Sequence, residues 1–110
     1  GDGRQTRSLC YVSDTVEALT RLMASDYSAP VNGGNPDEMS VLALAEAIIW
    51  MTKSKSVIQF EPLPLDDPKR RCPDIALAKR VLGWTPKVGS AAGLALTIKS
   101  FVPEAARMVA

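Results

Sequence analysis

Two arginine-bearing segments hold the side chains of this chain that are best suited to chemistry. Residues 1–8, GDGRQTRS, set an amide, a hydroxyl and two guanidinium groups beside a glycine turn, and residues 69–71 are three consecutive cations in a proline-rich loop. A planar guanidinium pairs bidentately with phosphate oxygens, and a stiff loop loses little entropy when it presents one. If Arg7 and Arg71 converge from these two segments, they would suit a diphosphate.

The charges of the whole chain are nearly balanced, and this limits the classes of partner. The 110 residues include 13 basic and 12 acidic side chains, for a net charge of +1. So small a net charge gives no field strong enough to indicate nucleic acid or an anionic membrane as a partner. As an alternative to phosphate binding, the three cations at 69–71 could lie in solvent with their charge neutralised by Asp66, Asp67 and Asp74.

Metal and redox chemistry have little support in the sequence. The chain contains no histidine, and Cys10 and Cys72 stand far apart without the spacing of metal ligands. No metal site is therefore expected. The cysteines are expected as two reduced thiols, although a disulfide stays open if their segments meet. No apolar run reaches the roughly 18 residues that a membrane span requires.

A helix is expected to follow the first arginine-bearing segment. A strand-like run at 9–12 precedes it, Asp14 and Glu17 have the spacing of a capping box, and the helix should end near Ser25. Its apolar side chains recur at helical spacing, which predicts one apolar stripe. The stripe consists of Val16, Leu19, Leu22 and Met23.

A second helix is expected at 41–52, after a short strand at 29–32 and a turn at 35–37. Ser40 is a good N-cap for this helix because its hydroxyl can accept a hydrogen bond from the first turn. The helix is apolar nearly all round. This pattern predicts burial on more than one face and, in so small a chain, a missing partner surface.

The second half of the chain begins with extended and irregular segments. A short strand is expected at 57–60, and four prolines among charges predict an irregular loop over 61–73. Asp74 should cap a third helix at about 75–82, and Gly83 should end it.

The end of the chain completes a mixed α/β layout. The indole of Trp84 is expected to cover the core, and a last helix should run from Ser90 until Pro103 ends or kinks it. Four helices with two or three short strands indicate one α/β domain over residues 1–110. The strands are too few for a complete Rossmann sheet, no GxGxxG fingerprint occurs, and the glycine pair at 33–34 lacks the third glycine of a phosphate loop.

Three motifs follow one another along nearly the whole chain. They are GDGxQTRxxxYVxD from Gly1, NxGNP from Asn32 and DDPxxRxPDI…A…LGWxP from Asp66. In this order they resemble the C-terminal third of UDP-glucuronate decarboxylases, which are extended short-chain dehydrogenases. Related NDP-sugar dehydratases and epimerases share parts of the first and last motifs, whereas QTR combined with DDPxxRxPDI is more particular to the decarboxylases.

The resemblance implies an enzyme that binds NAD in an N-terminal Rossmann domain and UDP-glucuronate in a cleft against the present portion. Such an enzyme oxidises the sugar at C4, releases CO₂ from the β-keto acid and returns the hydride to give UDP-xylose. Gln5, Thr6 and Arg7 match family positions that line the UDP-sugar site, and Arg71 matches an arginine that reaches the diphosphate. Asp14 matches a position expected to cap its helix.

The same resemblance implies that this chain is not catalytic alone. The family's Tyr-x-x-x-Lys pair and its cofactor fingerprint do not occur in the sequence, so no catalytic or cofactor-binding residue is assigned. The sequence begins within a motif, which leads us to expect a truncated chain. The parent enzyme is expected to be a homodimer in the cytoplasm, with a secretory-pathway lumen as the alternative compartment.

Two other interpretations stay open. The chain could come from a related NDP-sugar 4,6-dehydratase or epimerase. It could also be a non-catalytic interaction module whose apolar helix at 41–52 binds a partner chain.

Overall fold

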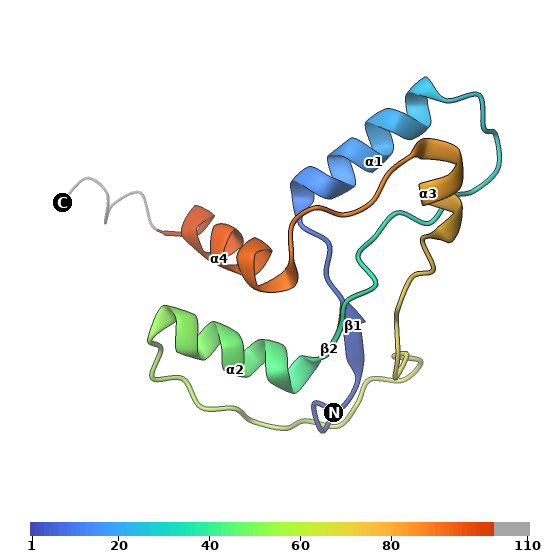
Figure 1. The fold of residues 1–110 in the computed structure, drawn as a ribbon. Coiled ribbons are helices and arrows are strands. Elements are labelled where there is room, and N and C mark those ends of the chain that lie inside the picture. Colours follow the sequence, from blue (N-terminus) through green and yellow to red (C-terminus); the bar gives the residue numbers. More distant parts are fainter. Residues whose placement is uncertain (103–110) are drawn as a thin grey trace.

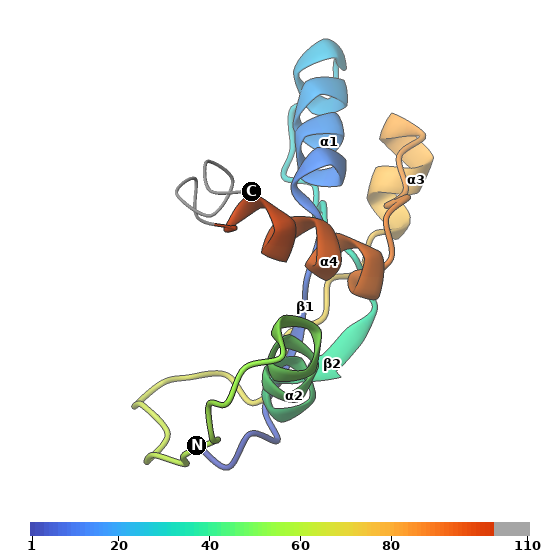
Figure 2. The same cartoon turned by 90° about the vertical axis from the view of Figure 1, so that its left-hand side faces the viewer.

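The structure, a computed structural model, describes residues 1–102 and has a mixed α/β layout within them (Figure 1). Its elements are β1 (Thr6–Ser8), α1 (Val12–Ala24), β2 (Glu38–Ser40), α2 (Val41–Thr52), α3 (Ala76–Leu82) and α4 (Ser90–Ser100). The helices α1 and α3 lie at one end of the molecule and α2 at the other, with the two strands beside α2 and with α4 between α1 and α2 (Figures 1 and 2). The expected four helices are confirmed. No helix within these residues combines the length and apolar character needed to cross a membrane.

The strands form one small antiparallel sheet, and its position corrects the sequence-based expectation. β1 pairs with β2 in a register that sets Thr6 opposite Ser40 and Ser8 opposite Glu38. The strands predicted at 9–12, 29–32 and 57–60 are wrong. Apolar composition suggested these strands, but a strand forms only where its backbone groups pair with those of a neighbour. Here that pairing joins two polar segments, residues 6–8 and 38–40.

The start of α1 differs from the predicted capping box. Tyr11 is the N-cap and makes no side-chain capping bond, so the prediction that Asp14 caps this helix with Glu17 reaching back is wrong. Asp14 instead lies in the first turn, 2% exposed. Its Oδ2 accepts hydrogen bonds from the backbone N–H groups of Lys87 (3.0 Å) and Val88 (2.9 Å). A buried carboxylate requires donors, and the loop after Trp84 provides two of them.

The core lies between α1 and α3 and is made of small side chains around one large one. It contains Ala18, Ile75, Ala78 and Trp84, and the indole is fully buried. Trp84 Nε1 donates to the backbone oxygen of Asp14 at 3.0 Å, which satisfies the one polar atom of the ring. The expectation that Trp84 covers the core is confirmed.

The C-terminal end of α3 follows the sequence more closely than its start. The N-cap is Ile75 and makes no side-chain capping bond, so the prediction that Asp74 is the cap is wrong. Asp74, one residue earlier, still accepts a hydrogen bond at Oδ1 from the N–H of Ala76 at 3.0 Å. Gly83 ends the helix with φ of 60°, in the left-handed region that favours glycine. Arg21 of α1 then donates to the carbonyls of Leu82 (3.0 Å) and Gly83 (2.8 Å), so the last carbonyls of α3 are capped by a cation.

The other end of the molecule is more open. Ser40 caps α2 as expected, since its Oγ accepts from the N–H of Ala43 at 3.0 Å. The predicted burial of α2 on more than one face is wrong within the described residues, because none of its side chains is buried and Trp50 is 80% exposed. α4 starts at Ser90 as expected, whereas Pro103 lies outside the described residues. Cys10 and Cys72 are both free thiols.

Candidate functional site

The two arginine-bearing segments lie side by side. The N–H of Thr6 donates to the carbonyl of Lys69 at 2.9 Å, and the N–H of Arg71 donates to the carbonyl of Thr6 at 3.3 Å. This is the hydrogen-bond pattern of a parallel neighbour, so residues 69–71 run along the edge of β1 that β2 leaves free. The tertiary structure therefore brings the segments of Arg7 and Arg71 together.

Side-chain alternation divides the predicted site residues between two faces. Along an extended chain successive side chains point to opposite faces, so Gln5 and Arg7 share one face and Thr6 takes the other. In the paired segment, Lys69 and Arg71 fall on the face of Gln5. Of the four predicted site residues, Gln5, Arg7 and Arg71 thus share a face, and Thr6 lies on the opposite one.

On the opposite face, polar side chains bind one another. The Thr6 hydroxyl donates to Glu38 Oε2 at 2.8 Å, and Arg70 Nε lies 2.7 Å from the same oxygen. The hydrogen bond from Arg70 and then that from Thr6 lower the pKa of Glu38 below its ordinary value. Thr6 is therefore occupied in joining β1 to β2.

Arg7 is largely engaged within the protein. Its Nη1 donates to the carbonyls of Thr6 (2.7 Å) and Pro68 (2.8 Å), and its Nη2 forms an ion pair with Asp67 at 2.8 Å. These bonds use three of the five N–H donors of a guanidinium. Arg7 and Asp67 together therefore brace the loop that carries Lys69 and Arg71. The alternative that neighbouring aspartates neutralise residues 69–71 is wrong for Arg70, because Glu38 is its partner.

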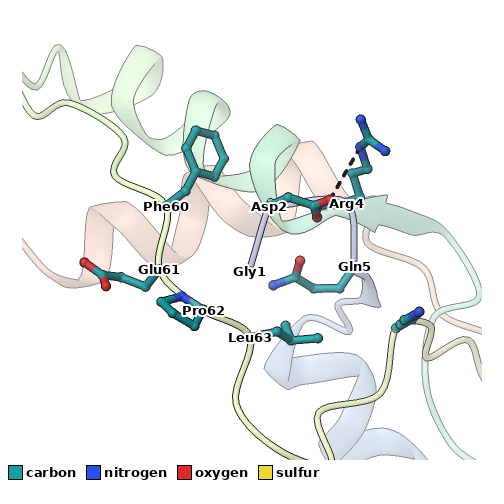
Figure 3. Close-up of a pocket in the computed structure, with 9 residues that line it drawn as sticks. Gly1, Asp2, Arg4, Gln5, Phe60, Glu61, Pro62 and Leu63 are labelled. Atoms are coloured by element: carbon teal, nitrogen blue, oxygen red, sulfur yellow. Dashed lines mark hydrogen bonds and ion pairs between the residues drawn. The ribbon is translucent and has the colours of Figure 1, made fainter.

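A hollow of about 710 Å³ opens beside this face (Figure 3). It is lined by Gly1, Asp2, Arg4, Gln5, Phe60, Glu61, Pro62, Leu63 and Lys69. Figure 3 shows the Gln5 side chain extending from the first segment towards residues 60–63. Gly1 packs tightly here, since a Cβ at this position would lie 2.8 Å from Leu63 Cδ1 and 3.3 Å from Gln5 Oε1. A hollow of this size falls in the range of small-molecule sites.

Gln5 is the predicted site residue that lines the hollow, while Lys69, Phe60 and Leu63 line it without having been assigned to a site. A signal for the last two was available in the sequence. The proline-rich loop fixes an extended segment at 60–63 that has to lie against some other part of the chain.

The cations near the hollow differ in whether they are already paired. Arg4 pairs with Asp2 at 3.6 Å, on the exposed surface. Within residues 1–102, no hydrogen bond or ion pair engages the ammonium of Lys69 or the guanidinium of Arg71. These two exposed cations on one face are suited to bind phosphate oxygens. The described residues hold no cluster of three or more cysteine or acidic side chains that could bind a metal.

Known proteins similar to this chain are nucleotide-sugar enzymes. The chain is 50% identical over 104 residues to UDP-glucuronic acid decarboxylase 1 of Danio rerio, a match that covers 94% of the chain and 25% of the relative. It is 48% identical over 101 residues to UDP-glucuronic acid decarboxylase 4 of Arabidopsis thaliana, covering 92% of the chain and 23% of the relative. The match falls in the C-terminal part of these relatives. This chain is a homologue of the C-terminal part of the UDP-glucuronic acid decarboxylases.

Solved structures agree with this homology at the level of the fold. A UDP-glucose 4-epimerase of Thermotoga maritima with UDP-glucose superposes with a TM-score of 0.86 at 31% identity, covering 92% of this chain and 33% of the epimerase. MoeE5 in complex with UDP-glucuronic acid and NAD superposes with a TM-score of 0.79 at 29% identity, covering 92% of this chain and 36% of MoeE5. No family model matches the chain. The chain thus has the fold of one part of an extended short-chain dehydrogenase and spans about a quarter of the length of its curated relatives.

Proposed function

We propose that this chain supplies the UDP-binding side of an NAD-dependent UDP-glucuronate decarboxylase, the enzyme that makes UDP-xylose. Lys69 and Arg71 bind the diphosphate, Gln5 contacts the nucleotide sugar in the hollow, and Arg7 holds the loop in place. The homology to UDP-glucuronic acid decarboxylases supports this assignment over the related epimerases. The parent enzyme is a cytoplasmic homodimer in this proposal.

The observation that carries the proposal is the pairing of residues 69–71 with β1. Without it, the cations of the proline-rich loop would have no fixed position relative to Gln5. With it, unpaired positive charge and a neutral amide stand on one face beside a hollow large enough for a ligand. Because Arg7 already fixes the loop through Asp67 and Pro68, little further entropy is lost when a diphosphate binds.

The described residues do not form a cradle for NAD. A dinucleotide requires a glycine-rich turn into which its phosphates can enter. The glycine pair at 33–34 is packed against protein instead, because a Cβ on Gly34 would lie 3.0 Å from Pro73 Cγ and one on Gly33 would lie 3.3 Å from Ala18 Cβ. NAD therefore binds, in this proposal, to a part of the decarboxylase outside these residues, and no step of hydride transfer is assigned to the side chains present.

The test is a calorimetric titration of UDP into the purified chain. We expect saturable binding, and we expect Arg71→Ala to weaken it by about 1.5–3 kcal/mol, as for loss of a charge-assisted hydrogen bond. Arg80→Ala is the matched control, since Arg80 is an exposed arginine on α3 away from the hollow.

Three outcomes would contradict the proposal. An unchanged affinity in Arg71→Ala would remove that residue from the site. Absence of UDP binding by the folded chain would show that these residues alone do not form the nucleotide site. Formation of UDP-xylose by the pure chain with added NAD would contradict the assignment of catalysis to other parts of the enzyme.

A further inference from the structure

The middle one of the three consecutive cations at 69–71 has an acidic partner that its neighbours lack. Arg70 Nε lies 2.7 Å from Glu38 Oε2, and the Glu38 side chain is 24% exposed, so solvent screens this carboxylate only in part. Lys69 and Arg71 lie on the opposite face, and within residues 1–102 neither of their cationic groups is in an ion pair. Glu38 thus engages one cation of the three and leaves two for a ligand.

The backbone register of this segment determines which cations reach the side of the hollow. The N–H of Thr6 donates to the carbonyl of Lys69, and the N–H of Arg71 donates to the carbonyl of Thr6, so Thr6 stands beside residue 70. Successive side chains of an extended segment point to opposite faces, and a shift of one residue moves each of them to the other face. The observed register therefore turns Lys69 and Arg71 toward the side of the hollow and Arg70 away from it.

A shift of one residue in either direction would change the charge on both faces. The face beside the hollow would receive Arg70 together with Pro68 or Cys72, and so it would carry one cation instead of two. The face of Glu38 would receive one of the outer two cations. Because each of these cations can pair with a carboxylate, Glu38 has a partner in all three registers as long as residue 70 is an arginine.

Contacts on both sides of the three cations favour the observed register. Arg7 donates to the carbonyl of Pro68 and pairs with Asp67, both at 2.8 Å. The Ser8 hydroxyl donates to the carbonyl of Arg71 at 3.1 Å. These contacts select the register while every register offers the acid a partner. Without a charge at position 70, they would be opposed by an ionised carboxylate whose nearest cations stand one residue away on either side.

We propose that Arg70 is a positioning residue for the diphosphate: its charge occupies Glu38 and thereby keeps Lys69 and Arg71 on the ligand side. Arg70 stands on the opposite face and makes no contact with the ligand. The effect on UDP binding rests on the proposed function. The effect on the register does not, and it can be measured without a ligand.

The first experiment is a double-mutant cycle of Arg70→Ala and Glu38→Gln in the 110-residue chain, with UDP affinity measured by calorimetry. The ionic strength is physiological, so that long-range attraction between exposed charges is largely screened. We expect Arg70→Ala to weaken UDP binding about three- to tenfold, because the unpaired Glu38 then draws Lys69 or Arg71 from the ligand side. Arg80→Ala removes one exposed positive charge from α3 and, as the matched control, should change the affinity less than about twofold.

The cycle separates positioning from a loss of charge. Glu38→Gln removes the attraction, so the double variant should bind UDP within about twofold of the wild type, and so should Glu38→Gln alone. The same affinity in the double variant and in Arg70→Ala would overturn the proposal, as would an effect of Glu38→Gln that is equal in both backgrounds. If Arg70→Ala does not fold, Arg70→Gln is measured in the same way, because it keeps part of the stem and removes the charge.

The second experiment measures the register directly, by amide hydrogen exchange of the ligand-free chain followed by NMR. In the wild type the N–H of Arg71 is hydrogen-bonded to β1 and should exchange slowly. In Arg70→Ala this protection should move to residue 70 or 72, and Glu38→Gln should return it to Arg71. Protection that stays at Arg71 in Arg70→Ala would contradict the proposal whether or not the chain binds UDP.

The two experiments also distinguish failure of this inference from failure of the proposed function. A wild type that does not bind UDP, with protection that moves in Arg70→Ala, contradicts the nucleotide site and leaves the control of the register by Arg70 intact. UDP binding with protection that does not move keeps the nucleotide site and removes Arg70 as its positioning residue.

Discussion

The two tryptophans differ in burial, and this difference shows that the two ends of the molecule are packed differently. Trp84, between α1 and α3, is fully buried and donates a hydrogen bond to Asp14, whereas Trp50 on α2 is 80% exposed. The first end is held by small side chains packed around one indole and by polar contacts to backbone groups. At the second end the apolar side chains of α2 are at most half-buried, and none of them is fully buried. Apolar composition alone therefore did not decide which helix is buried.

Substitution of the two tryptophans should give the largest contrast in stability. We expect Trp84→Ala to lower the free energy of unfolding by about 3–5 kcal/mol, because it leaves a large cavity and removes a satisfied polar atom. Trp50→Ala should change it by less than about 0.5 kcal/mol, as for an exposed side chain. Urea unfolding followed by circular dichroism measures both. Similar losses for the two variants would show that the ends are equally well packed in solution.

Removal of the Asp14 carboxylate should have the next largest effect. Asp14→Ala leaves the N–H groups of Lys87 and Val88 without their acceptor, and we expect a loss of about 2–3 kcal/mol in the free energy of unfolding. Asp26→Ala is the matched control, since Asp26 is exposed just after α1. If the two variants unfold at the same urea concentration, the Asp14 contacts do not hold the loop.

The brace between Arg7 and Asp67 should contribute less. Their side chains are 24% and 29% exposed, so solvent screens the pair only in part. A double-mutant cycle with Arg7→Ala and Asp67→Ala should give a coupling energy of about 0.5–1.5 kcal/mol in unfolding. Additive effects of the two substitutions would mean that the loop is positioned by its backbone bonds alone.

The smallest expected effect is a dependence of stability on pH through Glu38. Its pKa is lowered in the folded protein, mainly by the hydrogen bond from Arg70, so the stabilising contribution is present above its ordinary pKa and is lost as the pH falls through the lowered one. The melting temperature of the wild type should therefore approach that of Glu38→Gln in acid and exceed it slightly near neutral pH. A difference that does not change with pH would show that the charge of Glu38 is not involved.

Part of the candidate site could be found in the sequence. Residue chemistry pointed to Arg7 and Arg71, and the family resemblance added Gln5 and Thr6. The two segments that carry these residues do lie together. Nothing in the sequence separates Thr6 from its neighbours, since the two faces of β1 exist only once the strand is paired. Lys69 and Phe60 were not assigned because their place beside Gln5 depends on how the proline-rich loop crosses the chain.

The sequence by itself determined the features that depend on neighbouring residues. The cap at Ser40, the left-handed end at Gly83, the bounds of α2 and the start of α4 all follow from local backbone chemistry. Only the tertiary structure decided the features that depend on distant partners. The strands form at 6–8 and 38–40, where backbone hydrogen-bond partners are available. Asp14 accepts hydrogen bonds from the loop after Trp84 instead of capping its own helix, and Arg7 forms an ion pair with Asp67. Buried polar groups are satisfied, and apolar faces are covered, by residues far away in the sequence. A local sequence pattern does not identify which distant residue makes each contact.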